Sequence, residues 1–253
     1  MAWAGVFLDA APEASHAVRM ATQIVLVPGF WLGAWAWDDV APLLADRGYA
    51  VVPLTLPGLE PGHSDRGGVT LNDHAETIVA ALDRGAERRV LVVHSGAALP
   101  GTMVLDRHPD LVDHIVFVDT APVRDGYAMN AQLEGPVFPL SAAWDDEMAE
   151  GSMRDLTGDQ LRTFEDHAVP QPGQTVSGQV RLYNEARLAV PATVVCTAFS
   201  SADYRAYADQ GAGFLAGLLD HTALAYVDLP TGHWPMWSRP AELAGLIDRA
   251  AAG

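Results

Sequence analysis

The sequence predicts an α/β fold: a mainly parallel, doubly wound sheet covered by helices on both faces. Short, continuous apolar runs alternate along the chain with segments whose apolar residues recur at helical spacing. Continuous apolar runs are typical of strands that are buried on both faces, as in parallel sheets. The chain has 253 residues, 49% of them hydrophobic, which is enough to bury one large core. We therefore expect one domain over residues 20–253.

Local signals mark where the elements begin and end. Gly48 ends the first helical segment, and Thr70 followed by Asp73 resembles a capping box that opens another helix. Pro240 stands at the start of a final amphipathic segment, where a missing N–H is tolerated. Six apolar runs are the predicted strands: residues 24–27, 50–54, 89–94, 114–119, 193–197 and 223–229.

Residues 120–191 break this alternation. The interval is far longer than the roughly 2 to 6 residues of an ordinary strand-to-helix link, so it predicts an inserted helical cap. Its apolar side chains, such as Phe138, Trp144 and Phe164, either cover a site at the end of the sheet or pack the cap onto the sheet.

Charge and composition exclude several classes of partner and cofactor. The formal net charge of −17 argues against binding to nucleic acids or anionic membranes, both of which need a cationic surface. All 15 basic residues are Arg, and without Lys there is no Schiff-base chemistry and no lysine-anchored pyridoxal cofactor. The only cysteine, Cys196, lies in an apolar run, which indicates a buried hydrophobic residue. Since no metal-binding histidine spacing occurs, we expect neither metal nor cofactor.

The first residues predict a cytoplasmic, soluble protein. Residues 1–19 lack a basic segment before their apolar opening, and no apolar run approaches the roughly 18 residues of a membrane span. This segment is either an extension outside the core or a stretch of chain packed on the surface. The expected partner is a small-molecule substrate.

The most informative stretch joins an apolar run to a serine. Residues 89–94 lead directly into Ser95, which is followed by Gly96 and Ala97. A serine at a sharp strand-to-helix turn presents its hydroxyl above the sheet and needs small neighbours, although Val93 is larger than the usual glycine. Ser95 is thus a predicted nucleophile, and the alternative is a serine that caps the next helix.

The order of motifs resembles the α/β-hydrolase superfamily: a glycine- and tryptophan-rich loop after the first strand, then the serine, an acid and a histidine. Within it, the chain is similar to the small-cap branch of plant-type esterases, hydroxynitrile lyases and bacterial esterases. Pro28 replaces the histidine that usually leads the loop motif of this branch. The remaining motif positions are matched by Gly29, Gly33, Trp35 and Trp37.

The resemblance implies a catalytic triad with Ser95 as nucleophile and His233 as base. The superfamily normally places the acid after the penultimate strand, which nominates Asp203. Asp119, at the end of an earlier strand, is the alternative, because some relatives carry the acid there.

The same resemblance implies an oxyanion hole and an acyl site. The backbone N–H groups of Phe30 and Gly96 are the expected oxyanion donors. The side chains of Phe30, Trp31, Trp144 and Trp234 are the expected substrate-binding residues.

The residues present favour ester chemistry over other reactions of this fold. Ser95 excludes the dehalogenases and epoxide hydrolases, which use an aspartate nucleophile, and Trp234 stands where hydroxynitrile lyases carry a lysine. We predict hydrolysis of a small, mostly apolar carboxylic ester or lactone, with neutral substrates preferred unless Arg124 or Arg181 enters the pocket. The alternatives are a C–C bond hydrolase, a biosynthetic cyclase or lyase, or a non-catalytic receptor for a small ligand.

Overall fold

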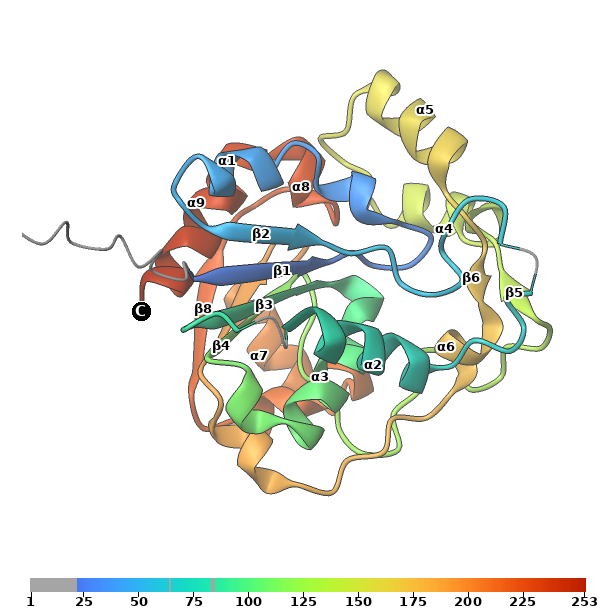
Figure 1. Ribbon diagram of the computed structural model, residues 1–253. Helices are drawn as coiled ribbons and strands as arrows, with labels where there is room; N and C mark the ends of the chain where they lie inside the picture. Colours follow the sequence, from blue (N-terminus) through green and yellow to red (C-terminus); the bar gives the residue numbers. More distant parts are fainter. Residues whose placement is uncertain (1–21, 64, 83–84) are drawn as a thin grey trace, which may run out of the picture.

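A six-stranded parallel sheet forms the centre of the protein (Figure 1). The computed structural model describes residues 22–63, 65–82 and 85–253, so the predicted extension at 1–19 lies outside the described residues. The strand order is β2-β1-β3-β4-β7-β8, and each neighbouring pair is parallel. The strands are β1 (Gln23–Val27), β2 (Ala50–Pro53), β3 (Arg89–His94), β4 (His114–Val118), β7 (Ala192–Cys196) and β8 (Leu224–Asp228).

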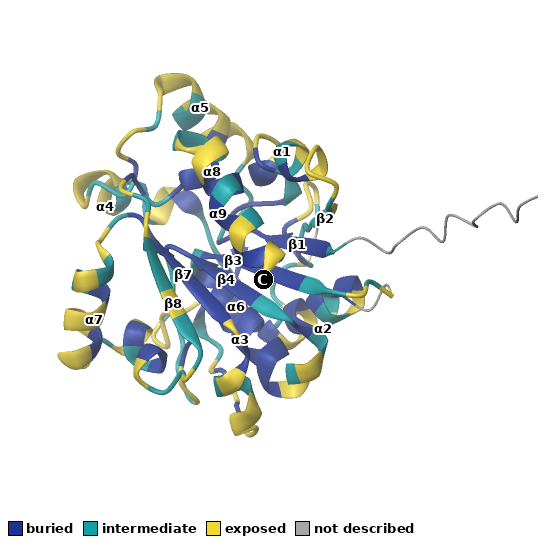
Figure 2. Cartoon of the chain, turned by 90° about the vertical axis from the view of Figure 1, so that its left-hand side faces the viewer, coloured by how far each residue is buried: buried dark blue, intermediate teal, exposed yellow. Residues whose placement is uncertain are grey.

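Helices cover both faces of this sheet, as the apolar runs predict (Figure 1). Alternate strand residues face opposite sides, so Ile24 belongs to one hydrophobic cluster and Val25 to the other. The central strands are buried on both faces, whereas β8 at the edge is half-buried (Figure 2). One layer contains α1 (Ala41–Ala45), α8 (Pro235–Ser238) and α9 (Pro240–Ala252); the other contains α2 (Leu71–Leu82), α3 (Ala98–Arg107) and α7 (Ser201–Asp209).

The capping box at Thr70 and the helix start at Pro240 are found as predicted, whereas α1 already ends at Ala45, before Gly48. The Thr70 backbone N–H donates to Asp73 Oδ2 at 2.8 Å, and the Asp73 N–H donates back to Thr70 Oγ1 at 3.4 Å. These bonds satisfy donors at the start of α2. Pro240 is the first residue of α9. Short 3-10 turns complete the core: η1 (Ala34–Trp37), η2 (Ser95–Ala97), η3 (Pro109–Leu111) and η6 (Gly213–Leu219).

We call residues 120–191 the cap. Its residues 137–177 lie beyond the carboxyl ends of the strands, and residues 183–191 return past the end of α3 to the start of β7 (Figure 1). In parallel α/β sheets the carboxyl ends of the strands form the edge at which ligands bind. The cap contains β5 (Val137–Phe138), η4 (Leu140–Ala142), α4 (Trp144–Ala149), α5 (Gly158–His167), β6 (Gln171–Pro172), α6 (Gly173–Ser177) and η5 (Glu185–Ala189). β5 and β6 pair antiparallel in a small separate sheet.

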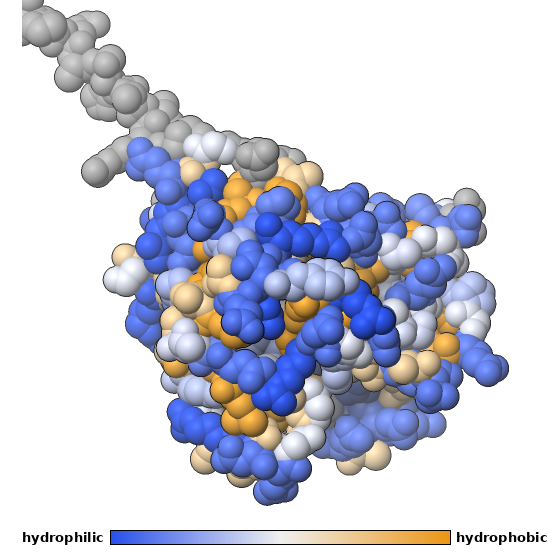
Figure 3. All heavy atoms as spheres, turned by 90° about the horizontal axis from the view of Figure 1, so that it is seen from below, coloured by the Kyte–Doolittle hydropathy of each residue, from blue (hydrophilic) through white to orange (hydrophobic). Residues whose placement is uncertain are grey.

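Hydrophilic side chains dominate the surface seen from below, with smaller hydrophobic areas between them (Figure 3). Across the described residues, no helix combines the length and apolar character needed to cross a membrane.

Candidate active site

Ser95 occupies the strained turn that the sequence predicts. It follows β3 directly and has a φ of +52°, in the left-handed region that non-glycine residues rarely adopt. Space for the turn comes from the glycines around it. A Cβ on Gly29 would lie 2.8 Å from the Ser95 Cβ, and a Cβ on Gly101 would lie 2.8 Å from Val93 Cγ1. Gly101 on α3 therefore provides the room that Val93 requires at a position where a smaller residue is expected.

His233 is paired with Asp119. Its Nδ1 lies 2.6 Å from Asp119 Oδ2. Asp119 follows β4 and, like Ser95, has a positive φ, of +46°. Ser95, Asp119 and His233 all line one cavity. In the part of the chain that the structure describes, no hydrogen bond joins Ser95 to His233. Hydrogen bonds between a catalytic serine and its histidine are often long in the absence of substrate and shorten when substrate binds.

Three donors hold the other oxygen of the Asp119 carboxylate. Asp119 Oδ1 accepts from the backbone N–H of Thr197 at 3.1 Å, from that of Ala198 at 3.0 Å and from the Tyr204 hydroxyl at 3.0 Å. Both amides belong to the turn after β7, which is the sheet neighbour of β4. The carboxylate is thus fixed by the adjacent strand end.

Electrostatics favour a charged aspartate beside a basic imidazole. Burial by itself would raise the pKa of Asp119. The hydrogen bond and charge of His233, together with the Ala198 and Thr197 amides, outweigh burial, and the pKa is lowered to about 2. Burial lowers the pKa of His233, but the hydrogen bond and charge of Asp119, with the charge of Glu147, raise it above its ordinary value. An imidazole held this way is suited to accept a proton from a hydroxyl.

The prediction that Asp203 orients His233 is wrong for this structure. Asp203 is the third residue of α7, and its Oδ2 accepts from the Ser200 N–H at 3.0 Å and the Ser200 hydroxyl at 2.6 Å. Its side chain caps a helix because Ser200 and Asp203 stand three residues apart at the helix start. This Ser-x-x-Asp spacing is the sequence signal that could have identified Asp203 as a capping residue.

The loop after β1 lies against the Ser95 turn, where an oxyanion hole would form. A Cβ on Gly96 would meet the Phe30 ring at 2.3 Å, so only glycine permits this contact. The Trp31 N–H donates to the side chain of Gln171 at 3.1 Å, and its indole N–H donates to the Phe138 carbonyl at 2.9 Å. The cap therefore holds the loop that carries Phe30. No motif marked Gln171, because its partner is 140 residues away.

His94 supports the backbone of His233. Its Nε2 donates to the His233 carbonyl at 2.7 Å, and the two ring centroids are 4.7 Å apart. Burial and the neighbouring charge of His233 lower the pKa of His94 to about 3, so this imidazole stays neutral beside the catalytic candidate.

The cavity at Ser95 has a volume of about 330 Å³ and a mostly apolar wall. Its charged lining side chains are carboxylates, with Glu147 and Glu150 contributed by α4 and the residues after it. Arg124 pairs with Asp220 and Arg181 bonds to Gln179, and neither lines the cavity. The apolar and aromatic lining consists of Leu99, Val123, Tyr127, Met129, Ala198, Phe199, Tyr204 and Phe214.

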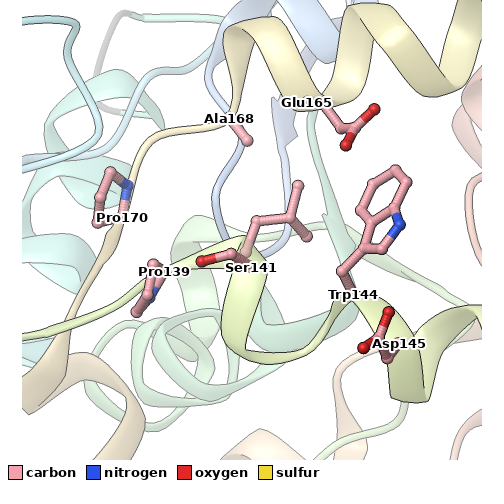
Figure 4. A pocket seen from close by; sticks show the side chains of 8 residues that line it. Pro139, Ser141, Trp144, Asp145, Glu165, Ala168 and Pro170 are labelled. Carbon is pink, nitrogen blue, oxygen red and sulfur yellow. The ribbon is translucent and has the colours of Figure 1, made fainter.

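The prediction that tryptophans line this cavity is wrong. Trp31 and Trp234 are buried elsewhere, Trp234 with its ring centroid 5.0 Å from that of Phe164. Trp144 faces a different pocket in the cap, between Asp145 and Glu165 (Figure 4). Phe30 packs on Gly96 beside the cavity rather than in its wall. Trp31 and Trp234 instead pack against Phe138 and Phe164, aromatic side chains of the cap.

Other reactive groups in the described part of the chain offer no second centre. Cys196 is buried, and desolvation raises the pKa of its thiol to about 12. No group of three or more His, Cys, Asp or Glu side chains within the described ranges is arranged to hold a metal ion.

Comparisons with known proteins agree with this architecture. The chain is 34% identical over 117 residues to Esterase PIR7B of Oryza sativa subsp. japonica, a match that covers 44% of this chain and 43% of the rice protein. It is 29% identical over 123 residues to the Carbendazim hydrolyzing esterase of Nocardioides sp. (strain SG-4G), covering 48% of this chain and 51% of that protein. These matches thus span about half the length of the relatives.

Solved structures share the fold over nearly the whole chain. A pyrethroid hydrolase from Sphingobium faniae JZ-2 superimposes with a TM-score of 0.70 at 20% identity, covering 92% of this chain and 98% of that one. The methylesterase MES16 from Arabidopsis gives a TM-score of 0.69 at 18% identity, covering 92% and 99%. The family model described as "Alpha/beta hydrolase family" matches residues 24–246. The chain therefore belongs to the alpha/beta hydrolase family, and the predicted fold class is confirmed.

Proposed function

We propose that this protein hydrolyses small, apolar, uncharged carboxylic esters through an acyl-enzyme on Ser95. The observation that carries the proposal is the 2.6 Å hydrogen bond between His233 and Asp119, in the same cavity as the strained Ser95. The esterase and methylesterase names of the relatives support the same reaction class.

In the first half of the proposed reaction, Ser95 Oγ attacks the ester carbonyl while His233 Nε2 takes the hydroxyl proton. The backbone N–H groups of Phe30 and Gly96 would stabilise the oxyanion, a kind of contact worth roughly 3 kcal/mol per donor. His233 then returns the proton to the departing alcohol, which leaves an acyl ester on Ser95. Water, deprotonated by His233, releases the acid and regenerates the serine.

Asp119 is the acid of the proposed triad. It accepts from His233 Nδ1, fixes the tautomer whose Nε2 is free to accept a proton, and stabilises the imidazolium that forms.

The cavity wall supports a preference for uncharged substrates. Aromatic and aliphatic side chains suit an apolar acyl or alcohol group, whereas Glu147 and Glu150 would repel a free carboxylate. The net charge of −17 acts in the same direction.

A fluorophosphonate probe and a graded set of esters test the proposal. Mass spectrometry should place the probe on Ser95, and Ser95→Ala should lose both labelling and turnover of short 4-nitrophenyl esters. Ser141→Ala is the matched control, because Ser141 lies in the other pocket of the cap. A folded protein that binds esters without turnover and leaves Ser95 unlabelled would instead be a receptor, and the proposal would be wrong.

A further inference from the structure

A short segment of the cap touches the loop that carries His233 and the turn after β7 whose amides hold Asp119. The carbonyl of Ser152 accepts from the His233 backbone N–H at 2.7 Å. The Asp155 carboxylate accepts from the Thr231 hydroxyl at 3.0 Å. Segment Ser152–Asp155 therefore holds the histidine loop on either side of Gly232.

Arg154 connects the same segment to the acid. Its Nη2 donates to the carbonyl of Thr197 at 3.0 Å and to that of Ala198 at 3.1 Å. The N–H groups of these two residues are the donors that hold Asp119 Oδ1. A guanidinium that binds the two carbonyls restrains the orientation of the turn from which both amides point at the carboxylate.

The packing around Gly232 shows how closely the segment fits. A Cβ at this position would lie 2.4 Å from the Arg154 carbonyl oxygen and 2.5 Å from that of Ser152. Asp155 keeps a φ of +69° in this arrangement, a conformation that costs about 1 kcal/mol or more for a non-glycine residue. The segment is thus fitted to the histidine loop rather than merely near it.

We propose that segment Ser152–Asp155 of the cap positions the Asp119–His233 pair, with Arg154 as the side chain that joins the Thr197–Ala198 turn, which holds Asp119, to the histidine loop. Arg154 acts through the Thr197–Ala198 turn and is a positioning residue. The core strands bring the Thr197–Ala198 turn and the histidine loop to one edge, where the Thr231 N–H donates to the Thr197 carbonyl at 3.4 Å. This piece of the cap adds a second connection between them through Arg154.

Substitution at Arg154 tests the inference with activity and with proton NMR. Arg154→Ala should lower kcat roughly ten- to a hundred-fold, the range expected when catalytic groups are displaced by about 1 Å, with KM changed less than about two-fold. Arg154→Lys should recover part of kcat because it keeps one charged donor. Arg162→Ala is the control, since Arg162 lies in the same cap and pairs at the surface with Asp159.

The decisive readout is the Nδ1–H resonance of protonated His233, which reports the hydrogen bond to Asp119. It should shift or broaden in Arg154→Ala, and in Gly232→Ala by steric displacement, while Arg162→Ala keeps it. An unchanged resonance in Arg154→Ala, or a loss confined to KM, would show that Arg154 only anchors the cap. The inference uses the proposed function for its kinetic arm alone; the resonance needs no substrate, so the two proposals can fail separately.

Discussion

Replacing Asp119 by asparagine separates its chemical role from its structural one. The carboxylate accepts four hydrogen bonds, three at Oδ1 and one at Oδ2. The asparagine amide would keep an oxygen for the Thr197, Ala198 and Tyr204 donors, but would present an NH₂ group to His233 Nδ1. That group requires a lone pair on Nδ1 and therefore moves the imidazole proton to Nε2, where the base must be unprotonated.

The expected effect of Asp119→Asn on kcat is large and its effect on stability is modest. Loss of the correct tautomer lowers kcat by up to roughly 10⁴ in a serine triad, or about 5 kcal/mol of transition-state stabilisation. All four hydrogen bonds can still form, but each becomes a weaker, neutral bond, while the cost of burying a charge is removed. The free energy of unfolding should therefore fall by about 1.5–3 kcal/mol. The fold should therefore survive.

Asp203→Asn is the matched control. The half-buried Asp203 bonds with Ser200 at the start of α7 and, among the described residues, with no group of the active site. Its replacement should leave kcat within about two-fold and weaken a helix N-cap worth about 1 kcal/mol. Kinetics on a short neutral ester, with circular dichroism to confirm folding, would measure both variants. If Asp119→Asn keeps kcat within about ten-fold of the parent while Asp203→Asn loses it, our assignment of the acid is refuted.

Three further outcomes follow from the same site. Because the pKa of His233 is raised above the ordinary value of about 6.5, a kcat/KM profile should be at its maximum above that pKa and fall as the pH decreases through it; a midpoint below about 6 would contradict this. Tyr204→Phe removes one donor to Asp119 and should lower kcat several-fold with KM unchanged, whereas a change in KM alone would show that the hydroxyl contacts substrate instead. Glu147→Gln should lower the midpoint of the pH profile, because the charge of Glu147 raises the pKa of His233, and it should raise kcat/KM for carboxylate-bearing esters relative to neutral ones. Glu134 does not line the cavity, so Glu134→Gln should have neither effect.

The sequence alone was sufficient for the parts of the protein that depend on local chemistry. Apolar runs predicted all six strands of the main sheet to within about one residue at each end, and the Ser95 turn followed from the run that ends at His94. These features are readable because burial on both faces of a parallel sheet demands continuous apolar residues, and because a strained turn demands small neighbours.

Only the tertiary structure decided which carboxylate meets His233 and which side chains form the cavity. β4 and β7 are neighbours, with Val118 beside Val195, so Asp119 and the turn after Cys196 reach the same point at the edge of the sheet. Sequence order cannot separate two strand ends that become adjacent only when the sheet forms. Asp203, which lies beyond β7, instead forms a capping box with Ser200 at the start of its own helix α7, because Ser200 is the nearer partner. The cavity wall likewise combines residues from Ser95 to His233 that no spacing relates, because burial depends on the packing of the whole chain.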